Sequence, residues 1–181
     1  MVLRRLRDVL TQGYDATFGS LEAGEVSYPP GGAIKEVDNS PLKTSPAQSH
    51  TFNLSEDFDK VIFDIKGIEN VSGSRQDISM RVNGVSSGSN YFYRDNADNE
   101  TQSENEWLLG NVSNNQIIFG EVSIQGVGSN IGFKPDIGSS TGNTVTEWGI
   151  LLSNSGPIDS VTIFGGLGDI IVNARVYGKT V

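Results

Sequence analysis

The sequence predicts an all-β protein, an antiparallel two-sheet sandwich preceded by a short N-terminal helix and an extended arm. Apolar and polar residues alternate with the two-residue period of half-buried strands from residue 49 onward. The composition, 22 Gly and 6 Pro in 181 residues, is typical of a fold with many turns. No helical period interrupts residues 47–181. We therefore expect one sandwich domain there, with a jelly roll as the first topology and an immunoglobulin-like fold as the second.

The chain opens with a short amphipathic pattern. Leu3, Leu6, Val9 and Leu10 fall on one face of a helix, and arginines occupy the rest of its surface. The pattern predicts one helix that ends near Gly13. Because so short a helix is marginal on its own in water, we expect it to be ordered only where its apolar stripe docks on another surface.

Residues 17–46 follow neither period. The run YPPGG at 28–32 requires an extended chain and then a turn, which excludes a helix. We therefore interpret residues 1–46 as an N-terminal helix and extended arm, with the stripe of the helix as its anchoring surface.

Eight strands are predicted in the body, in chain order. In the second, Val61, Phe63 and Ile65 should face the core, and in the sixth Trp148, Ile150 and Leu152 should do so. The eight ranges are 49–54, 59–68, 77–83, 91–94, 116–125, 145–153, 158–164 and 169–179.

Charge and composition exclude several classes of partner. Thirteen basic and 22 acidic residues give a net charge of −9, which repels phosphate backbones and anionic membrane surfaces. The chain has no cysteine, and it has no apolar run of about 20 residues that could span a membrane. We expect a soluble, unprocessed chain that binds neither nucleic acid nor membrane.

No catalytic constellation stands out, so we expect a protein that is not an enzyme. The single histidine, His50, lies where the arm meets the body and has no nucleophile motif to assist it. Glu104 and Glu106 could serve a sugar-cleaving site only if they lined one cleft, and their spacing in a polar segment is weak evidence for that. No cofactor is predicted.

An acidic segment and a few aromatic residues are the remaining candidates for binding. Asp95, Asp98 and Glu100 are weak candidate ligands for Ca²⁺, since their segment lacks the spacing of an EF-hand loop. Tyr93 and Trp107 are candidate glycan contacts, because amphipathic rings often stack on sugars. Packing in the core is the alternative for Trp107.

Two stretches of the body resemble a known class of module. The first is MRVNG at 80–84 followed by SNYFYR at 89–94, and the second is GPIDSVTIF at 156–164 followed by ARVYGK at 174–179. Both are similar to segments of the jelly-roll modules found in head-decoration, head-fibre, tail-fibre and baseplate proteins of tailed viruses. The resemblance covers at most residues 48–181.

That resemblance implies a structural protein on the surface of a virus particle. Modules of this class usually form homo-oligomers, such as trimers or other rings, so we expect a homo-oligomer whose arm binds other virion proteins. The exposed sandwich could then contact a glycan on the host surface. Two rivals remain at this stage: a carbohydrate-binding sandwich module of a secreted protein, and a sugar-cleaving viral depolymerase.

Overall fold

The protein is all-β and consists of two antiparallel sheets, as the sequence predicts. The computed structural model describes residues 25–26, 34–37, 42–86, 90–95, 100–127, 129–140, 146–152 and 157–179, and these residues contain no helix. The predicted N-terminal helix and its stripe (Leu3, Leu6, Val9 and Leu10) lie outside the described residues. In chain order the strands are β1 (Glu25–Val26), β2 (Ile34–Glu36), β3 (Leu42–Lys43), β4 (Ser49–Phe58), β5 (Lys60–Asn70), β6 (Gln76–Val82), β7 (Tyr91–Asp95), β8 (Glu100–Glu104), β9 (Trp107–Val112), β10 (Ile117–Val127), β11 (Asn130–Ser139), β12 (Thr146–Leu151), β13 (Ile158–Gly165) and β14 (Ile170–Lys179).

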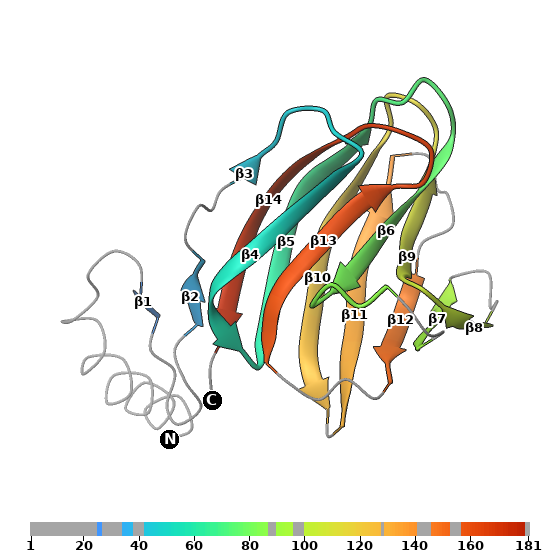
Figure 1. Ribbon diagram of the computed structural model, residues 1–181. Coiled ribbons are helices and arrows are strands. Elements are labelled where there is room, and N and C mark those ends of the chain that lie inside the picture. Colours follow the sequence, from blue (N-terminus) through green and yellow to red (C-terminus); the bar gives the residue numbers. More distant parts are fainter. Residues whose placement is uncertain are drawn as a thin grey trace, which may run out of the picture.

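The strands form two packed layers. The smaller sheet has the order β4-β13-β6-β9, and it lies in front of the larger one in Figure 1. The larger sheet has the order β1-β2-β14-β5-β10-β11-β12-β7-β8, with β3 also paired to β14. Side chains that alternate inward from both sheets fill the space between them, which is the packing of a β-sandwich.

All eight predicted strands are present. β8, β9 and β11 are additional within the body, and β1, β2 and β3 are additional within the predicted arm. β11 contains two glycines and Pro135, residues that usually argue against a strand. Pro135 is tolerated because β12 pairs with β11 only from Ile131 to Phe133, so the missing N–H faces no partner strand on that side. The buried residues Ile131, Phe133 and Pro135 nevertheless keep the alternation of a half-buried strand.

Three short pieces of the predicted arm, β2, Val37 and β3, lie along the outer edge of β14. β2 pairs with β14 from Tyr177 to Lys179, and β3 pairs with it at Asn173 and Ala174. Between these two strands Val37 is buried, and its N–H donates to the carbonyl of Val176. These pieces therefore cover backbone groups of β14 that would otherwise be an open edge.

A buried polar cluster closes one end of the sandwich. It consists of Asn70, at the end of β5, with Ser72 and Gln76, and we call it the Asn70 cluster. The Nδ2 of Asn70 donates to the carbonyls of Ser74 (2.7 Å) and Val112 (2.8 Å), while its Oδ1 accepts from Ser72 and from Nε2 of Gln76.

The Asn70 cluster also holds the final hairpin. Oε1 of Gln76 accepts from the N–H groups of Leu167 and Gly168, both at 3.0 Å. Gly165, which begins this hairpin, leaves the room that the amide needs, because a Cβ there would lie 2.6 Å from Oε1 of Gln76. One amide pair thus joins the turn after β5, the end of β9 and the β13–β14 hairpin, which meet at the top of Figure 1.

Candidate functional site

The predicted calcium ligands are only partly covered by the structure. Asp95 ends β7 and Glu100 begins β8, so the two flank the connection of a hairpin, but Asp98 lies outside the described residues. Within the described part of the chain, no group of three or more His, Asp or Glu side chains is placed to hold a metal ion. The calcium hypothesis stays a prediction.

The two predicted glycan contacts face the interior. Trp107 begins β9 and is fully buried, stacked on Phe133 with ring centroids 4.5 Å apart and an interplanar angle of 13°. Tyr91 meets the same indole edge-on at 5.0 Å. Tyr93 is partly buried and packs against this core. Trp107 therefore presents no ring face to a ligand, and its large apolar surface explains why it lies in the core instead.

Trp148 departs from the predicted alternation in the opposite direction. The pattern predicts Trp148 and Ile150 inward, whereas Trp148 is 44% exposed and Leu151 is buried. The inward position beside Trp148 is Gly149, where a Cβ would lie only 2.7 Å from Nε1 of Trp107. Trp107 occupies the space that an inward side chain on β12 would need, so the larger residue turns to the outer face.

Two of the acid–base candidates, Glu106 and His50, are engaged in structural contacts. Glu106 forms an ion pair with Arg81 at 2.6 Å, and the guanidinium of Arg81 also lies 4.5 Å from the ring centroid of Phe164. Glu104 lies in β8. Nε2 of His50 is 3.1 Å from the carbonyl oxygen of Ile170, which can only accept, so this nitrogen carries the hydrogen. His50 thereby ties β4 to β14.

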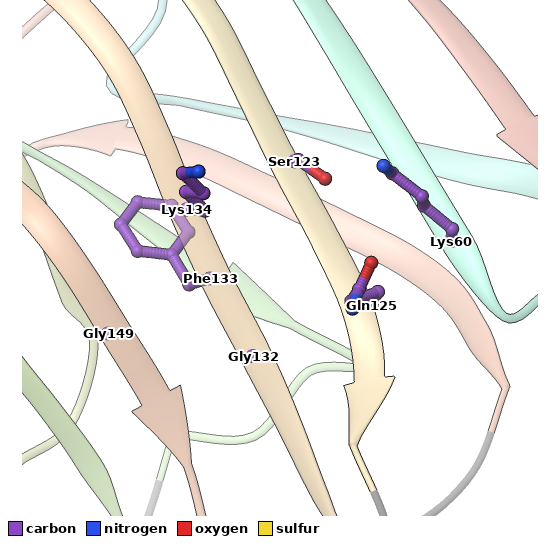
Figure 2. Close-up of a pocket in the computed structure, with 7 residues that line it drawn as sticks. All are labelled: Lys60, Ser123, Gln125, Gly132, Phe133, Lys134 and Gly149. Atoms are coloured by element: carbon purple, nitrogen blue, oxygen red, sulfur yellow. The ribbon is translucent and has the colours of Figure 1, made fainter.

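A shallow hollow lies on the outer face of the larger sheet. Its volume is about 370 Å³. Figure 2 shows Ser123 and Gln125 on β10 between Lys60 on β5 and Lys134 on β11. Gly132 supplies the depth, since it places no side chain between Gln125 and Ile150, its partners on the two neighbouring strands. We call this site the lysine hollow; its lining is completed by Phe133 and Gly149.

The polar groups of the lysine hollow are not used by the fold. Among the residues that the structure describes, neither Lys60 nor Lys134 forms an ion pair, and Ser123 and Gln125 form no side-chain hydrogen bond. Two ammonium groups, a hydroxyl and an amide therefore face the solvent from three adjacent strands. Such groups can bind an anion and the hydroxyls around it.

Charge is segregated along this outer face. The strand registers define rows of residues that lie side by side across β14, β5, β10 and β11. Across these four strands the two rows at the hollow contain three lysines and no carboxylate: Lys179, Lys60, Gln125 and Gly132, then Tyr177, Ile62, Ser123 and Lys134. The nearest carboxylate in register is Glu36 on β2, the partner of Tyr177 at the end away from the hollow. The next row, which we call the acidic row, contains Arg175, Asp64, Glu121 and Asp136.

No pattern in the sequence points directly to this hollow. Lys60, Ser123 and Gln125 occupy outward positions of predicted strands, but β11, which carries Lys134 and Gly132, was not predicted. Without β11, nothing places Lys134 near Lys60, since 74 positions separate them in the chain.

Comparison by sequence and by structure finds no family model, curated protein or solved structure that matches this chain. The described residues contain no helix that is long and apolar enough to cross a membrane.

Proposed function

We propose that the protein is a structural component of a tailed-virus particle, of the decoration, head-fibre or turret type. In this proposal the sandwich is a jelly roll that forms a homo-oligomer on the particle surface, and the N-terminal arm anchors it to other virion proteins. The role is binding and assembly rather than catalysis, in keeping with the structural contacts of Glu106 and His50.

The strand order supports a jelly roll. In that fold the first strand lies beside the last in one sheet, and the second strand lies in the other sheet beside the one that precedes the last. If β11 and β12 are an insertion and β14 is an additional strand, then β4 is the first strand and β13 the last. β4 then pairs with β13 in the smaller sheet, and β5 pairs with β10 in the larger one. β6 lies between β13 and β9, which completes the smaller sheet in the expected order.

The observation that carries the proposal is that the two stretches of resemblance contact each other through a motif residue. Asn83, in the first stretch, has a φ of 52° and is followed by Gly84 at 65°, which is the left-handed turn that Asn-Gly favours. Its Oδ1 accepts from the N–H of Asp159 (3.1 Å), and its Nδ2 donates to the carbonyl of Pro157 (2.8 Å). Both contacts lie in the second stretch.

Burial of the apolar stripe would supply the anchor. Four side chains, Leu3, Leu6, Val9 and Leu10, contribute about 1.5–3 kcal/mol each when fully buried, so about 6–12 kcal/mol before ordering costs. Several copies in one oligomer multiply this attachment without a large single interface.

The test is incorporation of the full chain into particles. Wild-type protein should sediment with purified virions and should form a closed homo-oligomer by light scattering. Leu6→Asp should abolish incorporation while leaving the oligomer and its thermal unfolding unchanged, because it alters only the stripe. Arg4→Gln, on the opposite face of the predicted helix, is the matched control and should be incorporated normally.

Two outcomes would overturn the proposal. Virions that lack the wild-type protein would contradict the location, and a monomer at tens of micromolar would contradict assembly through the sandwich. Normal incorporation of Leu6→Asp would contradict the arm as anchor.

A further inference from the structure

We propose that the lysine hollow binds an acidic saccharide, a sugar ring that carries a carboxylate or sulfate group. Lys60 and Lys134 would hold the anion, Ser123 and Gln125 would bind hydroxyl groups, and Trp148 would stack on the ring. Neither the contacts within the fold nor the proposed role in a virus particle accounts for this set of residues.

The preference for an anion comes from the unpaired lysines. The chain has a net charge of −9, yet the two rows at the hollow contain Lys60, Lys134 and Lys179 without a carboxylate. Elsewhere on the same face Lys66 is neutralised by Asp64 at 2.6 Å. The lysines at the hollow have no such partner among the described residues and can attract a negatively charged ligand.

The spacing of the two lysines fits one ligand held between them. β5 and β11 flank β10, so the backbones that carry Lys60 and Lys134 are about 10 Å apart at the usual strand spacing. Both side chains are long enough to reach over Ser123 and Gln125, which lie on the strand between them (Figure 2). An anion above β10 would therefore meet both ammonium groups and the two neutral donors.

The preference for a sugar ring comes from Trp148. Phe133 and Gly149 are the last register partners of β11 and β12, and both line the hollow. Lys134 and Trp148 are the next residues of these two strands, so Trp148 directly precedes a lining residue of the hollow. The indole is 44% exposed although it could bury more than 150 Å² of apolar surface. Its exposed face beside a row of hydrogen-bond donors suits the apolar face of a pyranose, whereas a free inorganic anion would not use it.

Binding should be measured on the full chain by tryptophan fluorescence. The chain has two tryptophans, and Trp107 is fully buried, so a change on ligand addition reports mainly on Trp148. The probes are tetragalacturonate, its methyl ester as the uncharged counterpart, a sulfated galactan tetrasaccharide and sodium sulfate. We expect at least one of the two acidic oligosaccharides to bind, and its affinity to fall as the salt concentration rises.

Four substitutions assign the binding to the hollow. Lys60→Gln and Lys134→Gln should each lower the affinity about tenfold, since each removes one charge-assisted contact. Trp148→Ala should weaken binding by a similar factor, measured by calorimetry because the fluorescent reporter is lost. Lys66→Gln is the matched control: it removes a lysine from the same face outside the two rows, and the affinity should stay within twofold.

Several results would overturn the inference. The inference would fail if neither acidic oligosaccharide bound at concentrations up to about 10 mM. If the methyl ester bound as tightly as tetragalacturonate, a negative charge would not be required. If sulfate bound as tightly as the oligosaccharides, a sugar ring would not be required. Equal losses in Lys66→Gln and Lys134→Gln would indicate non-specific charge attraction. These measurements need no virus particle, so their failure is distinct from failure of the proposed function.

Discussion

The two ends of β5 show two opposite uses of polar side chains. At one end Asn70 is fully buried, and every polar atom of its amide has a partner within the protein. At the other end, about 33 Å away at 3.3 Å per residue, Lys60 lies at a hollow and has no partner among the described residues. The hydrogen bonds of Asn70 are therefore part of the fold, whereas the side chain of Lys60 makes no contact on which the fold depends.

The largest effect should follow from emptying the Asn70 cluster. Asn70→Ala removes the buried donor to the carbonyl of Val112 and the buried acceptor for Nε2 of Gln76. We expect a loss of about 3 kcal/mol in the free energy of unfolding, measured by urea denaturation.

The neighbouring Asn114 is the control for that substitution. Its Oδ1 accepts one exposed hydrogen bond from the N–H of Gly73 at 2.8 Å. Asn114→Ala should therefore cost under about 1 kcal/mol. Equal losses for the two variants would mean that burial of the cluster contributes nothing to the difference between the two ends of β5.

Tyr91 provides an intermediate test of the same contrast. Its hydroxyl accepts from the N–H of Val82 (3.1 Å) and donates to the carbonyl of Val85 (3.0 Å), so Tyr91→Phe leaves both without that partner. We expect a loss of about 1–3 kcal/mol at neutral pH.

The hydroxyl of Tyr91 also predicts a dependence on pH. Burial raises its pKa above the usual value near 10, because the charged form would lose its hydration. The neutral form is favoured in the folded state, so the contribution is full below about pH 10 and is lost as the pH rises through the folded pKa. The difference in unfolding free energy between wild type and Tyr91→Phe should shrink above pH 10; a constant difference would contradict burial as the cause.

The ion pair on the smaller sheet should contribute less. Arg81 and Glu106 are about one-third exposed, at 32% and 31%, and solvent screens their attraction. Glu106→Gln should change the free energy of unfolding by about 0–1 kcal/mol, and the change should vanish in 1 M salt. A larger loss that persists in salt would place Glu106 with the buried, partnered groups.

The smallest effect is expected at the lysine hollow. Lys60→Gln and Lys134→Gln remove charges that the fold does not pair, so each should change the unfolding free energy by less than about 0.5 kcal/mol. A loss above 1 kcal/mol in either variant would show that these lysines stabilise the sandwich, and the contrast between the two ends of β5 would fail.

The alternation of apolar and polar residues predicted most of the core, and its error in β12 has a cause outside that strand. Val61, Phe63 and Ile65 face inward as expected. Trp148 faces outward because Trp107, which is distant in the sequence, fills the core beside Gly149. A pattern within one strand carries no information on what occupies the facing layer, so such exchanges cannot be read from it.

The hollow was beyond sequence reasoning for a related reason. β11 is rich in residues that disfavour strands, and its stability comes from pairing with β10 over ten positions. The Asn70 cluster was equally hidden, because Asn70 and Gln76 resemble ordinary turn residues until the β13–β14 hairpin is placed over them. In both places the tertiary structure decides what the polar residues do.

The position of β14 governs when this chain can fold. It runs from Ile170 to Lys179, and it joins β5 to β2 and β3, which lie far earlier in the sequence. These earlier strands have no place in the larger sheet until β14 has paired with β5. The closure of such distant pairs is slow, so we expect refolding on a timescale of milliseconds to seconds. Until β14 pairs, this edge of β5 is exposed, and the yield of native protein should depend on how fast that pairing forms.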